Sequence, residues 1–205
     1  MIKLYAWPGS SGTRVAWALE EIGLPYEYVT LDASKGEHRS SEYLKVNPHG
    51  KVPALVDGDE RLFESGAILL HLGHKYGVGK NLWPAGKGQA RADAVCWTVW
   101  AMTELGPYLL QYLYHGLDTP VSFKPADRSK AAADYSRSQL DRLLAALEAR
   151  LEGREFLLGA FSLVDVAAAS WLAFGTMFGL ALDRYPRVAA WCGRCMERPA
   201  FKRAR

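Results

Sequence analysis

A change in hydrophobic period near residue 80 constrains the fold of this 205-residue chain more than any other feature. Up to that point, short strand-like runs alternate with segments of helical spacing, whereas the pattern is helical from Gln89 onward. Alternating strands and helices are typical of an α/β layer, and sustained helical spacing is typical of a bundle. We therefore expect an α/β domain at residues 1–80 and an all-α domain at 87–205, joined by a connector rich in glycine and proline.

The order of elements in the first domain excludes an all-parallel sheet. Strands expected at residues 2–7 and 26–31 flank a helix, which makes a β-α-β unit. Two further runs, at 52–56 and 61–63, flank the turn signal Asp-Gly-Asp-Glu at 57–60. Strands joined by so short a turn are antiparallel, so we expect a mixed sheet and no Rossmann domain. Pro53, inside one of these runs, marks either a sheet edge or a cis peptide bond.

Two signals predict buried helices in the second domain. Leucines recur at i, i+4, i+7 and i+11 between Leu140 and Leu151, which places them on one helix face. Ser162 and Asp165 have the spacing of a capping box, with Asp in place of the usual Glu or Gln, before a helix of small residues.

Composition and charge exclude several classes of protein. The chain is 49% hydrophobic and 23% charged, and its three cysteines are too few for a disulfide scaffold. Residues 184–205 hold seven basic side chains and one acidic one, which accounts for the net charge of +3. A solvated helix end explains that cluster better than a nucleic-acid surface. There is no signal-peptide pattern and no apolar run of ~18 residues, so we expect no membrane partner and a cytoplasmic location.

One motif suggests redox or zinc chemistry. Trp191-Cys192-Gly193-Arg194-Cys195 has the form of a thioredoxin centre, but such a centre needs its thiolate at a helix N-terminus after a strand. This motif lies inside a predicted helix, and Val188, Cys192 and Cys195 share one face of it. No second Cys or His pair supplies the other ligands of a zinc ion. We therefore interpret both cysteines as core residues and expect no metal.

Seven motifs, in this order and spacing, give the chain a resemblance to the cytosolic glutathione S-transferases over essentially its whole length. They are RVAWALEE (14–21), EHRS (37–40), NPHGKVPAL (47–55), FESGAI (63–68), NLWP (81–84), FSLVD (161–165) and RPAF (198–201). The resemblance implies a thioredoxin-like N-terminal domain with a mixed four-stranded sheet that carries the glutathione site. It also implies an all-helical C-terminal domain that supplies most of the electrophile site, and a homodimer.

The resemblance further implies that a hydroxyl group before the first helix stabilises the glutathione thiolate, because only the thiolate is a strong nucleophile. Ser10 matches the catalytic serine of the serine-type classes. Ser11 matches, in another gapless alignment, the cysteine of some bacterial classes. We prefer Ser10, although either serine would cap a helix in any protein. Tyr5 is the alternative from classes with a first-strand tyrosine, but the Arg-Gly pair that usually follows is missing, so we expect it to be a packed strand residue.

The same resemblance assigns residues to the tripeptide. Glu64-Ser65, at a helix start, match the pair that holds the γ-glutamyl head. Val52, before Pro53, matches the residue whose main chain pairs with the cysteinyl amide. Lys51 and His38 match positions near the glycine carboxylate.

An aromatic stripe with one carboxylate lies on one face of the helix expected near 90–115. Its members are Trp97, Trp100, Glu104, Tyr108, Tyr112 and His115. The stripe suits an apolar-electrophile pocket, a dimer face or a packed core. Gly106-Pro107 should kink this helix. We select Trp100 and Tyr108 as candidate electrophile-site residues.

We expect a transferase that joins the thiolate of glutathione, its co-substrate, to hydrophobic electrophiles, with no nucleic-acid partner. The first alternative is glutathione-dependent isomerisation, dehalogenation, or reduction of peroxides or mixed disulfides. The turn at 10–12 weakly resembles the zeta-type isomerase motif but lacks its Cys and second Ser, and thiol transfer normally needs a cysteine there. The second alternative is a non-catalytic glutathione-binding stress protein.

Overall fold

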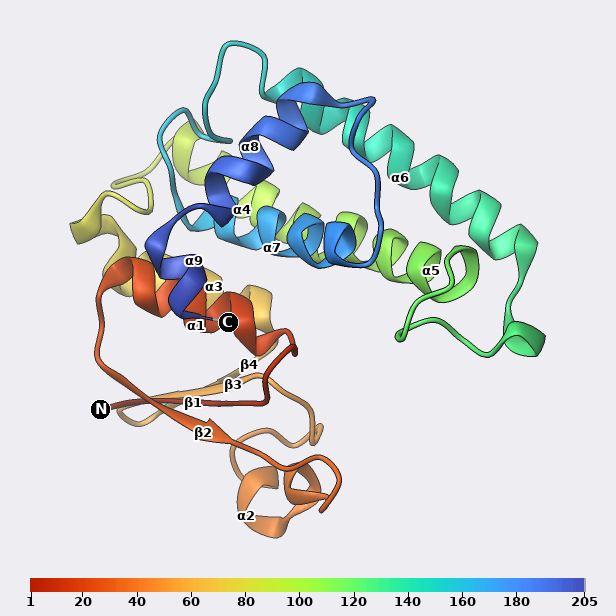
Figure 1. Cartoon of the computed structure of the whole chain (residues 1–205). Helices are drawn as coiled ribbons and strands as arrows, with labels where there is room; N and C mark the ends of the chain where they lie inside the picture. The colour runs from red at the N-terminus through yellow and green to blue at the C-terminus, as the bar shows by residue number, and fades with distance from the viewer. Residues whose placement is uncertain (205) are drawn as a thin grey trace. The chain divides into compact units, whose positions relative to one another are not determined.

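The computed structural model describes residues 1–204, which form two compact units (Figure 1). One unit comprises Met1–Gly86 together with the segment that begins at Glu197, and the other is Lys87–Met196. The segment from Glu197 was expected in the helical domain, but it packs with the α/β unit. None of the helices in the described part of the chain has the length and hydropathy to cross a lipid bilayer.

The sheet of the first unit is mixed and four-stranded, as predicted. Its strands are β1 (Ile2–Ala6), β2 (Tyr26–Thr30), β3 (Ala54–Asp57) and β4 (Glu60–Phe63), in the order β2-β1-β3-β4. β1 pairs in parallel with β2 and antiparallel with β3, which pairs antiparallel with β4. Gly58, with φ of +64°, begins the two-residue turn between β3 and β4. The predicted hairpin and the β-α-β unit are therefore both present.

Helices α1 (Gly12–Ile22) and α3 (Ser65–Leu72) lie on the same face of the sheet, whereas the short α2 (Ser41–Leu44) lies beyond its other side (Figure 1). A π-helical turn at Gly73–Gly77 continues α3. The core between helices and sheet consists of fully buried apolar side chains, including Leu4, Val15, Leu19, Leu55, Ile68 and Leu69.

The end of the chain packs on α1 through the short helix α9 (Pro199–Arg203). The rings of Phe201 and Trp17 have centroids 4.8 Å apart. Arg198 donates two hydrogen bonds to the carboxylate of Glu21, of 2.6 and 2.7 Å, and the indole of Trp17 donates a third of 2.9 Å. Because the Glu21 side chain is only 6% exposed, this bidentate pair is shielded from water and screened little by salt.

The second unit is all-helical, as predicted. Its helices are α4 (Gln89–Trp100), α5 (Gly106–Gly116), α6 (Lys130–Arg150), α7 (Leu163–Met177) and α8 (Pro186–Met196). A π-helical turn at Ala101–Leu105 separates α4 from α5, immediately before the Gly106-Pro107 pair at which a kink was expected. Gly106 packs against Trp171, since a Cβ at this glycine would lie 2.4 Å from the indole.

The predicted core of the second unit is confirmed in detail. The four leucines of the predicted stripe, Leu140, Leu144, Leu147 and Leu151, are buried, as are Val188, Cys192 and Cys195 on α8. The capping box at Ser162 is also confirmed, because the Ser162 N–H donates to Asp165 Oδ2 while the Ser162 hydroxyl oxygen accepts from the backbone at the start of α7.

Candidate functional site

The turn between β1 and α1 fixes the hydroxyl of Ser10 in place. Ser10 Oγ donates to the carbonyl of Trp7 at 2.6 Å and accepts from the N–H of Gly12 at 3.1 Å. Ser11 occupies the N-cap position of α1 in a helical conformation, and its side chain makes no capping bond. Of the two candidate serines, Ser10 therefore binds the helix start, and its hydroxyl proton points back into the turn.

Glu64 and Ser65 stand at the N-terminus of α3, where unpaired N–H groups favour an anion. Glu64 has φ of +65° and ψ of 116°, a conformation that costs energy for any residue but glycine and that tends to occur at functional sites. Its carboxylate is exposed, whereas Ser65 is buried. The two residues thus offer a negative group and a hydroxyl side by side.

Arg14 of α1 reaches the same helix start, and sequence reasoning missed it as a site residue. Its Nη1 donates to Ser65 Oγ at 3.1 Å, and the residue is only 5% exposed. Burial lowers the pKa of the Arg14 guanidinium to about 9, which leaves it charged at neutral pH. Its spacing of four and eight residues from Ala18 and Ile22, on the buried face of α1, was the signal that could have identified it.

The segment before β3 is braced by its own loop. The carbonyl of Lys51 accepts hydrogen bonds from the Tyr43 hydroxyl (2.5 Å) and the Asn47 amide (2.6 Å), while the Lys51 side chain is exposed. Val52 is half-buried, and its bond to Pro53 is cis, one of the two possibilities expected from the sequence. Val52 and Pro53 lie directly before Ala54, the first residue of β3.

His38 lies beside the turn that carries Ser10. Its ring packs edge-on against Trp7, with centroids 5.8 Å apart, and its Nδ1 is buried without a hydrogen-bond partner among residues 1–204. Tyr5 instead packs against Tyr43 at 5.7 Å, as expected of a packed strand residue.

The register of the sheet brings these segments together at one end of the strands. Tyr5 of β1 is paired with Ala54 at the start of β3, which is paired with Phe63 at the end of β4. The residues that follow β1, precede β3 and follow β4 therefore meet there, and His38 joins them through Trp7. The predicted glutathione-binding residues come from three separate stretches of sequence, and the fold gathers them with the serine turn at this end of the strands.

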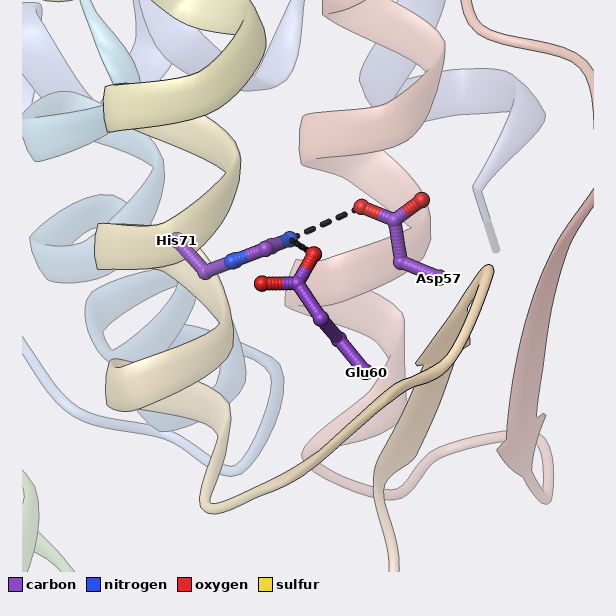
Figure 2. A group of neighbouring side chains, drawn as sticks. All are labelled: Asp57, Glu60 and His71. Atoms are coloured by element: carbon purple, nitrogen blue, oxygen red, sulfur yellow. Dashed lines mark hydrogen bonds and ion pairs between the residues drawn. The ribbon is translucent and has the colours of Figure 1, made fainter.

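A second cluster of polar side chains lies at the opposite end of the β3–β4 hairpin. Figure 2 shows His71 of α3 directed toward the carboxylates of Asp57 and Glu60 on the hairpin. His71 Nε2 lies 2.8 Å from Asp57 Oδ2 and 3.9 Å from Glu60 Oε2. This trio has ligands that suit a divalent cation. Lys75 Nζ, however, already lies 2.8 Å from Asp57 and 2.5 Å from Glu60, so the chain supplies the positive charge itself.

Tyr76 completes this group, because its hydroxyl lies 2.9 Å from both oxygens of Asp57. Burial by itself would raise the pKa of Asp57, but the hydrogen bonds from Lys75, His71 and Tyr76 outweigh it and hold the pKa below its usual value. Asp57 is therefore ionised at neutral pH.

The candidate electrophile-site residues belong to the helical unit, where the aromatic stripe is half-buried rather than part of the core. The ring of Trp100 lies 5.0 Å from that of Trp97, and the ring of Tyr108 lies 6.0 Å from that of Tyr135 on α6. The core face of this helix is formed by Leu105, Leu109 and Leu113 instead.

The fold of the first unit is thioredoxin-like, and comparison with known proteins identifies its family. The model of the glutathione S-transferase N-terminal domain matches residues 1–74, and that of the C-terminal domain matches residues 110–199. Glutathione S-transferase 1 of Zea mays is 36% identical over 197 residues, covering 93% of this chain and 89% of that protein. The chain therefore belongs to the glutathione S-transferase family.

Two further similar proteins extend the comparison. The disulfide-bond oxidoreductase YfcG of Escherichia coli K12 is 33% identical over 214 residues, covering 100% of this chain and 94% of that protein. The crystal structure of the glutathione transferase URE2P6 from Phanerochaete chrysosporium, in complex with oxidized glutathione, superimposes with a TM-score of 0.87 at 32% identity. That match covers 99% of this chain and 94% of the other.

Proposed function

We propose that this chain conjugates the thiolate of glutathione to hydrophobic electrophiles, with Ser10 as the hydroxyl that stabilises the thiolate. The observation that supports this proposal is that the three predicted glutathione-binding segments meet the serine turn before α1 at one end of the strands. In the reaction the thiolate attacks an electrophilic carbon, the C–S bond forms and a leaving group such as chloride departs. The thiol proton goes to water.

The energy required is within reach of one hydroxyl at one helix start. Lowering a thiol pKa by two units needs about 2.7 kcal/mol. A hydrogen bond to a charged group supplies about 1.5–3 kcal/mol, and a helix N-terminus about 0.3–2 kcal/mol. Ser10 would have to turn its proton from the Trp7 carbonyl toward sulfur, exchanging a neutral hydrogen bond for a charge-assisted one.

The remaining roles follow the ends of the tripeptide. Glu64 would bind the α-amino group, and Ser65, backed by Arg14 and the α3 N-terminus, would bind the γ-glutamyl carboxylate. The main chain of Val52 would pair with the cysteinyl amide. The side chains of Lys51 and His38 would bind the glycine carboxylate, and the buried, unpartnered Nδ1 of His38 supports that role.

The electrophile should bind to aromatic side chains of the helical unit. Trp100 and Tyr108 are our candidates for contacts to the electrophile, since both rings lie outside the leucine core of their unit. We propose that the protein forms a homodimer. We also propose that the boundary between its two domains lies between residues 80 and 87. A cytoplasmic location fits this chemistry, because glutathione is kept reduced there.

A second candidate function is the reduction of disulfides by glutathione. The active-site turn has no cysteine, and burial raises the pKa of Cys192 to about 12, so the thiols would have to come from glutathione itself. Two glutathione thiols would be oxidised to glutathione disulfide as the substrate disulfide is reduced to two thiols. The Escherichia coli relative is named a disulfide-bond oxidoreductase, and URE2P6 is in complex with oxidized glutathione; both favour this candidate.

The test uses two matched variants, Ser10→Ala and Ser11→Ala, with a chlorodinitrobenzene and with hydroxyethyl disulfide as substrates. We expect conjugation that Ser10→Ala reduces at least tenfold, while Ser11→Ala stays within about twofold of the wild type. Full activity of Ser10→Ala with loss in Ser11→Ala would move the role to Ser11. Turnover of the disulfide alone would establish the second candidate, and glutathione binding without turnover of either substrate would contradict both.

A further inference from the structure

The two segments that we propose bind the γ-glutamyl head and the cysteinyl amide are the two ends of one hairpin. Val52-Pro53 precede β3, and Glu64-Ser65 follow β4 and begin α3. Pairing of Ala54 with Phe63 holds these segments together at one end of the hairpin, and pairing of Asp57 with Glu60 closes the other end. The position of Ser65 relative to Val52 depends in addition on how α3, which begins at Ser65, is held against β3.

The far end of α3 is fastened to β3 through a single buried carboxylate. Asp57 is 7% exposed and accepts hydrogen bonds from His71, Lys75 and Tyr76, all on the last turn of α3 or the π-helical turn after it. Lys75 also binds Glu60 across the turn (the carboxylates and His71 are drawn in Figure 2). Three side chains of one helical segment thus converge on one residue of the strand.

The two elements match in length. Three residue steps along β3, from Ala54 to Asp57, span about 10 Å, and six steps along α3, from Ser65 to His71, span about 9 Å. Because a helix is stiff along its axis, a shift of α3 at Asp57 moves Ser65 by a similar amount. A displacement of about 1 Å lengthens a hydrogen bond of about 2.7–3.2 Å beyond the range in which it forms.

We propose that Asp57 and Lys75 are positioning residues for glutathione. They hold the end of α3 so that Glu64-Ser65 and the main chain of Val52 stand at the spacing that the tripeptide requires, although neither touches the tripeptide. This inference rests on the binding roles proposed above for those segments.

The experiment compares Asp57→Asn, Lys75→Met and Lys75→Arg with the wild-type protein. Lys3→Met is the matched control, since Lys3 forms a 2.9 Å pair with Glu27 between β1 and β2 of the same sheet. The measurements are the glutathione Kd by calorimetry, KM for glutathione and for a chlorodinitrobenzene, and kcat. We expect Asp57→Asn and Lys75→Met to raise the glutathione Kd and KM about tenfold, with kcat at saturating glutathione and KM for the electrophile within about twofold. Lys75→Arg should restore most of the affinity, and Lys3→Met should match the wild type.

The results separate this inference from the proposed function. An unchanged glutathione Kd in folded Lys75→Met would overturn the inference, even if the urea midpoint of this variant falls. If Asp57→Asn does not fold, the Kd of Lys75→Met alone tests the inference. A fall in kcat with an unchanged Kd would overturn it as well. Ser65→Ala tests the site itself: if this variant binds glutathione like the wild type, or if the wild type does not bind it, the proposed binding roles are wrong.

Discussion

Trp191 on α8 donates its indole N–H to Oδ1 of Asp165 at the start of α7, at a distance of 2.8 Å, and both side chains are completely buried. The same carboxylate accepts from the N–H of Leu157 and from the N–H and hydroxyl of Ser162. One side chain therefore joins the cap of α7, the preceding loop and α8.

Replacing Asp165 should destabilise the helical unit severely. Asp165→Ala leaves four buried donors without their acceptor, and we expect a loss of about 3–5 kcal/mol in the free energy of unfolding. Trp191→Phe removes one donor and some packing, and should cost about 1–3 kcal/mol. Urea unfolding at a fixed protein concentration measures both. The exposed Asp183→Ala is the control, and a loss in Asp165→Ala no larger than in this control would contradict the prediction.

Arg14 should be needed for glutathione affinity. Arg14→Met removes the donor to Ser65 Oγ and the buried positive charge behind it, so we expect KM for glutathione to rise about 10- to 100-fold. Arg14→Lys should recover only part of this, because an ammonium lacks the planar fork of a guanidinium. Steady-state kinetics with the exposed Arg184→Met as control give the comparison, and equal KM values in Arg14→Met and the control would refute the role.

The cysteines should divide sharply in reactivity. Cys96 is exposed, whereas Cys192 and Cys195 are buried, and burial raises the pKa of Cys192 to about 12. Since the thiolate is the reactive form, iodoacetamide at pH 7–9 should label Cys96 alone, and all three only after unfolding. Mass spectrometry of native and urea-treated protein reads the sites. Labelling of Cys192 in the native protein would reopen the redox interpretation of its CxxC motif.

Asp57 should make stability depend on acid. Its folded pKa lies below that of an ordinary Asp, so in acid the folded state binds fewer protons than the unfolded state does. The resulting stabilisation is fully present above the unfolded pKa and is lost as the pH falls through the folded value. Asp57→Asn should thus be less stable than the wild type at pH 7, and the difference in their free energies of unfolding should become smaller below pH 4. Asp59→Asn, on the exposed turn, should have the same free energy of unfolding as the wild type in the same urea titrations.

Local patterns predicted the elements well, because strand alternation, the turn at 57–60 and the leucine spacing are properties of neighbouring residues. The boundaries of β1 to β4 differ from prediction by two residues or fewer. Contacts between residues far apart in the sequence could not be predicted in this way. Nothing local indicated that the segment from Glu197 returns to α1. The helical spacing of Arg14 could have indicated its burial, but not that Ser65 is its partner. Likewise, the hydroxyl of Ser10 was expected before a helix, but its bond to Trp7 depends on the shape of the turn.

The packing of α9 on α1 also has a consequence for biosynthesis. A ribosome makes residues 1–86 before the helical unit, yet the side of α1 that contains Trp17 is covered by Phe201, which follows the whole helical unit in the chain. The α/β unit can thus reach its final packing only after the helical unit has been synthesised. Until then an apolar patch and the carboxylate of Glu21 remain open to solvent and to chaperones.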